Sequence, residues 1–134
     1  QGLSVTFHRA FDVCRNPHRA LEQIIKLGCN RILTSGQQPT AEQGIPLLEE
    51  LQKQAAGRIM LLAGCGVNEN NIARIAAETG INEFHFSARE NIQSEMKFRN
   101  EAVSMGGTVH INEYERNVTS IRRVKETIDA ALHG

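Results

Sequence analysis

Ionisable side chains cluster just after apolar runs in this chain. His8, Arg9 and Asp12 follow the first such run, and His85 lies near the end of the last. An imidazole near a carboxylate can exchange protons with a substrate, while a neighbouring guanidinium holds an anionic group. His8, Arg9, Asp12 and His85 are therefore candidate catalytic residues. The alternative is that these polar groups only hydrogen-bond to one another inside the fold.

A glycine-rich turn suggests a second kind of chemistry. Glycines let the backbone approach a ligand closely, and amides at the start of a helix favour a phosphate or carboxylate. The next apolar run adds a hydroxyl and a guanidinium at its end. The candidate anion-binding residues are Gly64, Gly66, Val67, Asn68, Ser87 and Arg89. The alternative is that the glycines only serve a tight turn and helix packing.

The elements that position these residues form a repeat. Strand-like runs occur at residues 3–7, 31–34, 58–63 and 83–87, and the markers Val5, Ile32, Ile59 and Phe84 are 27, 27 and 25 residues apart. Such a unit fits one strand and one helix.

Helical signals separate the strand-like runs. Asn16 and Pro17 are typical of a helix start and Gly28 of a helix end. A second helix carries Leu48, Leu51 and Ala55, with Pro46 in its first turn. A third runs from about residue 70 and ends before Gly80. After an irregular stretch over residues 90–117, a last helix has one apolar side made of Ile121, Val124, Ile128 and Leu132.

Strands that alternate with helices predict an α/β fold with a parallel sheet. A doubly wound open sheet would also place ligands at the carboxyl ends of its strands. However, no GxGxxG follows the first strand, and the even spacing favours a (β/α)₈ barrel. The chain supplies about four of its eight units. Strand alternation predicts that the aromatic side chains face the helices, namely Phe7, Phe84 and Phe86. Arg9 is expected on the same face as Phe7, and the barrel interior receives His8, His85 and Ser87.

Composition narrows the choice of partners. The 134 residues include 15 Lys and Arg and 15 Asp and Glu, so no net charge favours nucleic acid or an anionic membrane. No apolar run is long enough to span a bilayer. Cys14, Cys29 and Cys65 are scattered without a CxxC pair, which is typical of reduced thiols in a cytosolic protein.

Four blocks of sequence resemble one family. They read VTFHRAFD at residues 5–12, LTSG at 33–36, EFHFSAR at 83–89 and MKFRN at 96–100. Their content, order and spacing resemble the CutC family of copper-homeostasis proteins from the fifth barrel strand onward, and the resemblance covers roughly residues 5–132. It implies a (β/α)₈ barrel, a cytoplasmic location and a role in copper homeostasis. It does not imply a particular reaction.

The resemblance makes copper the expected metal, although burial as small apolar side chains is the favoured interpretation of the cysteines. Copper(I) prefers thiolate and thioether ligands and accepts imidazole. Cys65 is the cysteine expected at the same end of the barrel as His8 and His85. It is therefore the candidate copper ligand. The competing function is that of an enzyme acting on a small phosphorylated or carboxylated metabolite.

Residues 1–134 are expected to form a single, incomplete domain, the C-terminal half of a CutC-like barrel. The chain opens on Gln1 and enters a strand-like run at once, which suggests a fragment or a processed chain. Its first and last strands would present unpaired edges, so we expect a homo-oligomer.

Overall fold

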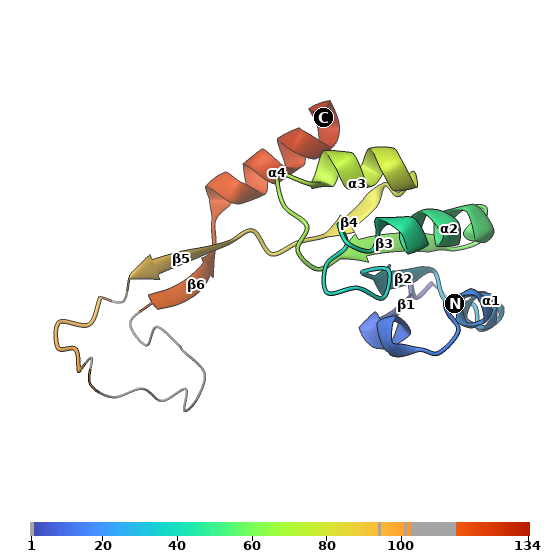
Figure 1. Cartoon of the computed structure of the whole chain (residues 1–134), viewed down its shortest axis with the longest axis horizontal. Helices are drawn as coiled ribbons and strands as arrows, with labels where there is room; N and C mark the ends of the chain where they lie inside the picture. Colours follow the sequence, from blue (N-terminus) through green and yellow to red (C-terminus); the bar gives the residue numbers. More distant parts are fainter. Residues whose placement is uncertain (1, 94, 101, 103–114) are drawn as a thin grey trace.

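The computed structural model describes residues 2–93, 95–100, 102 and 115–134. Its central sheet has four parallel strands in the order β1-β2-β3-β4. These are β1 (Thr6–Phe7), β2 (Arg31–Thr34), β3 (Met60–Gly64) and β4 (Glu83–His85). Crossover connections carry α1 (Pro17–Lys26), α2 (Ile45–Ala55) and α3 (Ile72–Thr79), and α4 (Ile121–His133) lies against α3 (Figure 1). The predicted α/β class is confirmed.

Strand register aligns the carboxyl ends along one edge of the sheet. Thr6 pairs with Arg31, Ile32 with Leu61, and Gly64 with His85. All three pairings are parallel, so the loops that follow the strands emerge on the same side. The candidate site residues after β1, β3 and β4 therefore share this edge.

The helices begin and end where the sequence predicted. The Asn16 side chain accepts a hydrogen bond from the Arg19 amide at 3.1 Å and caps α1, which opens with Pro17. Pro46 lies in the first turn of α2, where its missing N–H has no partner to lose. Gly80 ends α3 in the left-handed region, with φ of 76°.

The core lies between the sheet and α1, α2 and α3. Its members are fully or nearly fully buried and alternate along the strands with half-exposed residues such as Leu33 and Leu62. The largest are Phe11, Leu21, Ile32, Leu48, Leu51, Leu61, Ile72, Ile75 and Ile81. Phe7, Phe84 and Phe86 pack against this cluster, as predicted. His8, His85 and Ser87 are exposed. The His8 ring stacks on that of Phe7, with 5.7 Å between the ring centroids, so the predicted separation of these two side chains onto opposite faces is not seen.

Arg9 and Ser87 lie beyond the ends of the strands whose alternation was used to place their side chains. β1 ends at Phe7, and residues Arg9–Val13 form the 3₁₀ helix η1, capped by the His8 side chain. The strand alternation that placed Arg9 on the face of Phe7 therefore does not apply, and that prediction was wrong. β4 likewise ends at His85 rather than at residue 87.

The stretch from residue 90 to 117, predicted to be irregular, contains parts of two strands, whereas the described residues 95–100 are irregular as predicted. β5 (Arg89–Gln93) pairs antiparallel with β6 (Glu115–Thr119) and projects from the body of the molecule (Figure 1). Both strands are mostly polar and exposed, so they lack the apolar alternation by which a strand is recognised. The prediction over residues 94, 101 and 103–114 lies outside the described residues.

The apolar side of α4 is largely open to solvent. Ile121 is 81% exposed and Leu132 is 70% exposed, whereas Thr127 is fully buried. The helix contacts α3 through the side that carries Thr127 and Ala130. Within the described residues, no helix has the length and apolar character needed to cross a membrane.

Candidate functional site

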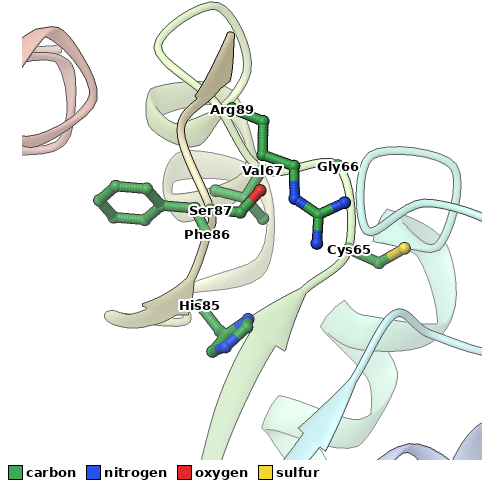
Figure 2. A pocket seen from close by; sticks show the side chains of 7 residues that line it. All are labelled: Cys65, Gly66, Val67, His85, Phe86, Ser87 and Arg89. Carbon is green, nitrogen blue, oxygen red and sulfur yellow. The ribbon is translucent and has the colours of Figure 1, made fainter. Parts of the chain in front are cut away.

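A pocket of about 300 Å³ opens at the carboxyl ends of β3 and β4 (Figure 2). Seven residues line it: Cys65, Gly66, Val67, His85, Phe86, Ser87 and Arg89. The structure thus brings together four predicted anion-binding residues, one predicted catalytic histidine and the candidate copper ligand. None of the seven lining residues is acidic.

The loop after β3 is held in an unusual backbone conformation. Cys65 and Gly66 both have positive φ, at 80° and 71°. A residue other than glycine rarely adopts this conformation unless its surroundings enforce it. Here the buried Asn71 side chain donates to the Gly66 carbonyl at 2.8 Å and accepts from the Asn68 amide at 2.9 Å. The loop is therefore fixed before any ligand arrives.

Several hydrogen-bond donors at the pocket have no acceptor among the residues that the structure describes. Among the residues that the structure describes, the amides of Gly66 and Val67 donate to no backbone acceptor, and Arg89 joins no ion pair. Figure 2 shows the Arg89 guanidinium reaching over Gly66 and Cys65, with Ser87 beside it. Because arginine stays protonated at neutral pH, the pocket carries a positive charge.

The two other predicted anion-binding residues do not line the pocket. At Gly64, a Cβ atom would lie 2.6 Å from a side-chain carbon of Leu33, so close packing explains this glycine. The Asn68 amide is already bonded to Asn71, and its side chain accepts from the Asn70 amide at 2.8 Å. Both residues shape the turn that presents the free amides of Gly66 and Val67.

Asp12 lies at the centre of a separate polar cluster after β1 and β2. Its carboxylate accepts from the Thr34 hydroxyl at 2.6 Å and from Arg9 Nε at 2.6 Å. The amides of Ser35 and Gln37 also donate to it. Burial favours the neutral acid, but these hydrogen bonds outweigh burial and lower the pKa of Asp12 below its ordinary value. A carboxylate stabilised in this way is a poor proton acceptor, so Asp12 positions its neighbours.

The two candidate histidines lie on opposite margins of the sheet. His8 follows β1, and its Nδ1 accepts from the Ala10 amide at 3.0 Å. His85 ends β4 and lines the pocket. β2 and β3 separate these two strands, so the four-stranded sheet does not bring His8 and His85 together. Only His85 stands beside the pocket donors.

The cysteines are free thiols, as predicted. Cys65 Sγ donates to the Pro39 carbonyl at 3.0 Å and lies at the pocket wall. Cys29 precedes β2 and belongs to the opposite end of the strands. Within the described ranges, no three His, Cys, Asp or Glu side chains come close enough to hold a metal ion.

The ion pair between Arg123 and Glu69 forms a brace between α4 and the pocket, which was not predicted from the sequence. Arg123 donates to both oxygens of Glu69 at 3.1 and 3.2 Å, and its guanidinium also contacts the Arg89 carbonyl. Glu69 belongs to the loop after β3, and Arg89 follows β4. Arg123 therefore ties together the two walls of the pocket. Because 54 residues separate Arg123 from Glu69, no local pattern indicates the pair.

Comparison with known proteins identifies the family. The CutC family model matches residues 1–90. A CutC family protein of Bacteroides thetaiotaomicron is 78% identical over 130 residues, covering 97% of this chain and 52% of that protein. One from Porphyromonas gingivalis strain W83 is 51% identical over 129 residues, covering 96% and 52%. The chain spans about half the length of the curated relatives it matches.

A solved structure agrees with the sequence comparison. The crystal structure of CutC from Streptococcus agalactiae, described as a proposed copper homeostasis protein, matches with a TM-score of 0.60 and 34% identity. The match covers 63% of this chain and 42% of that chain. The fold is thus TIM-barrel-like, and the parallel β/α units of this chain make up part of such a barrel. The chain belongs to the CutC family.

Proposed function

We propose that the pocket at the ends of β3 and β4 binds the phosphate or carboxylate of a small metabolite. One observation carries the proposal: Gly66, Val67, Ser87 and Arg89 line one pocket, and within the described residues the amides of Gly66 and Val67 have no backbone acceptor and Arg89 joins no ion pair. Amides that point at a ligand in a preformed turn bind an anion with little reorganisation. His85 at the same wall is the candidate proton donor or acceptor of a TIM-barrel enzyme.

Phosphate calorimetry on the purified chain tests the anion site. Binding of inorganic phosphate should be lost or weakened about tenfold in Arg89→Gln, which removes a charge-assisted contact. Arg15→Gln is the matched control, because Arg15 is also exposed and lies outside the pocket. Equal phosphate affinity in Arg89→Gln and the original chain would contradict the proposal, as would no phosphate binding at all.

We also propose, as the second function, that the full-length protein handles copper. The support is the family and the name of the Streptococcus agalactiae relative, together with Cys65 and His85 in one pocket. A thiol and an imidazole are acceptable copper(I) donors, yet copper(I) sites usually draw on more than one sulfur ligand. Cys65 and His85 alone do not fit a closed copper cage. Any tight site therefore needs donors beyond the described residues.

Competition against a copper(I) chelator separates the two functions. The chain alone should compete weakly, whereas a full-length relative should compete well if copper is its cargo. Tight one-to-one binding by the chain, abolished in Cys65→Ser but kept in Cys29→Ser, would contradict this expectation. Cys29 is a fair control because it is equally half-buried and lies at the other end of the strands.

Three further proposals concern the whole protein. Residues 1–134 constitute one incomplete domain, which is supported by the single core shared by the sheet and the helices around it. The protein is cytoplasmic, which is supported by its three free thiols. The 134-residue chain by itself self-associates, which is supported by the outer edges of β1 and β4, unpaired among the described residues.

A further inference from the structure

Arg9 is held firmly on one side and left open on the other. Its Nε donates to Asp12 at 2.6 Å, and its Nη2 donates to the Ser35 hydroxyl at 2.8 Å. The Asp12 side chain is 6% exposed, whereas that of Arg9 is 42% exposed. A guanidinium has five N–H donors, so this arrangement orients the group while leaving donors for a ligand.

Asp12 positions Arg9, rather than Arg9 positioning Asp12. Thr34, Ser35 and Gln37 already supply hydrogen bonds to the Asp12 carboxylate. The carboxylate is therefore satisfied without a cation, and its contact with Arg9 serves to fix the arginine. Such a fixed, half-exposed arginine is a common means of recognising an anion.

Arg9 also lies close to the pocket wall. The loop after β2 connects them: the Ser35 hydroxyl, bound by Arg9, donates to the Gln38 carbonyl at 2.6 Å, and Cys65 Sγ donates to the next carbonyl, that of Pro39. Figure 2 shows the Arg89 guanidinium extending toward Gly66 and Cys65, while the Cys65 sulfur points away from that guanidinium. Cys65 therefore links the loop that holds Arg9 to the pocket that Arg89 lines.

We propose that the ligand is a small metabolite with two anionic groups, one at each arginine. A phosphate occupies the Gly66 and Val67 amides with Ser87 and Arg89, and a second phosphate or carboxylate binds Arg9. The inference rests on the proposed anion site, since the first group occupies it. It adds the ligand class, a phosphorylated acid or a bisphosphate, and it gives Arg9 the role of selecting that class.

Calorimetry with a matched ligand series tests the second group. The probes are inorganic phosphate, 2-phosphoglycolate, 3-phosphoglycerate, and the carboxamides of the two acids. In each carboxamide an uncharged amide replaces the carboxylate and the phosphate is kept. At least one acid should bind about three- to tenfold more tightly than its amide, as expected for one half-exposed charged contact. Arg9→Gln should abolish that advantage and leave phosphate affinity unchanged. Arg89→Gln should weaken the binding of all five probes.

The outcomes distinguish the two proposals. If phosphate binds but neither acid binds more tightly than its amide, the proposed second anionic group at Arg9 is wrong and the single anion site stands. If phosphate does not bind, both proposals fail. The comparison of acid with amide uses the unmodified chain, so the test remains decisive even if Arg9→Gln does not fold.

Discussion

Arg123 of α4 donates hydrogen bonds to both carboxylate oxygens of Glu69, which lies 54 positions earlier in the chain. The fully buried Thr127 hydroxyl also contacts Glu69. The hydrogen bonds from Arg123, above all, lower the pKa of Glu69. Because Glu69 directly follows Asn68 in the loop after β3, the brace fixes the loop that carries the free amides. It also links the exposed last helix to the proposed anion site.

Removing the brace should weaken both folding and anion binding. Arg123→Gln breaks the ion pair, whose two side chains are 26% and 20% exposed, so we expect a loss of about 1 kcal/mol in the free energy of unfolding. Phosphate affinity should fall too. Arg122→Gln is the control, because Arg122 bonds mainly Glu126 on the same exposed helix face. Urea unfolding and calorimetry measure the two effects. Equal values for both variants would contradict the brace.

Comparing substitutions at Gly66 and Gly57 distinguishes the effect of backbone strain from the effect of blocking ligand access. Both have positive φ, at 71° and 79°. A Cβ at Gly66 would lie 3.1 Å from Thr40, whereas one at Gly57 would meet nothing within 4 Å. Alanine at either position should cost about 1 kcal/mol in unfolding free energy.

Only Gly66→Val should also abolish phosphate binding, because the branched side chain stands beside the free amides. Gly57→Val serves as its control, and calorimetry after a urea unfolding check makes the comparison. If both valine variants keep full phosphate affinity, the turn glycine has a structural role alone.

Asp12 makes folding stability dependent on pH. Its pKa is lowered in the folded state, so its contribution is present above the unfolded pKa of about 4 and is lost as pH falls through the folded pKa. Asp12→Asn should cost about 2 kcal/mol at pH 7, because amide hydrogens then face the donors of Ser35 and Gln37.

The same substitution should flatten the acid limb of the stability curve. Urea unfolding at pH 7, 5 and 3 measures the slope for both proteins. Glu22 contributes to the slope in both, since hydrogen bonds from Arg58 and Gln54 lower its pKa to about 2. An unchanged slope in Asp12→Asn would show that Asp12 titrates normally.

Self-association follows from the open edges of the sheet. In the part of the chain that the structure describes, β1 and β4 each pair with one neighbour, and the exposed Ile121 and Leu132 add apolar surface on α4. Exposed strand edges and apolar patches favour association. Sedimentation velocity at micromolar concentration should show dimers or larger species. A well-folded monomer under these conditions would overturn the proposed oligomer.

Local patterns were enough to predict most of the fold. The Asn16-Pro17 start of α1 and the Gly80 end of α3 depend on neighbours in sequence, and both are confirmed. The pocket residues around Gly66 and Arg89 could be predicted together because parallel strands bring their carboxyl ends to one edge. Alternation along a strand likewise predicted that Phe84 lies on the face of the sheet that packs against the helices.

The failures arise where distant contacts decide the conformation. Arg9 turns into η1, where Asp12 and Ser35 hold its side chain, and alternation no longer applies. The apolar side of α4 looked like a core face, yet the helix packs through Thr127, whose hydroxyl bonds the Arg123 carbonyl and Glu69. Neither arrangement has a periodic signature in sequence.

Amide chemical shifts under phosphate titration test the central claim most directly. In ¹⁵N-labelled protein, the resonances of Gly66 and Val67 should move most, with a saturating curve that disappears in Arg89→Gln. The Asn68 amide is already bonded to Asn71 and should move less. No saturable shift at Gly66 and Val67, or the same shift in Arg89→Gln, would contradict an anion site at the ends of β3 and β4.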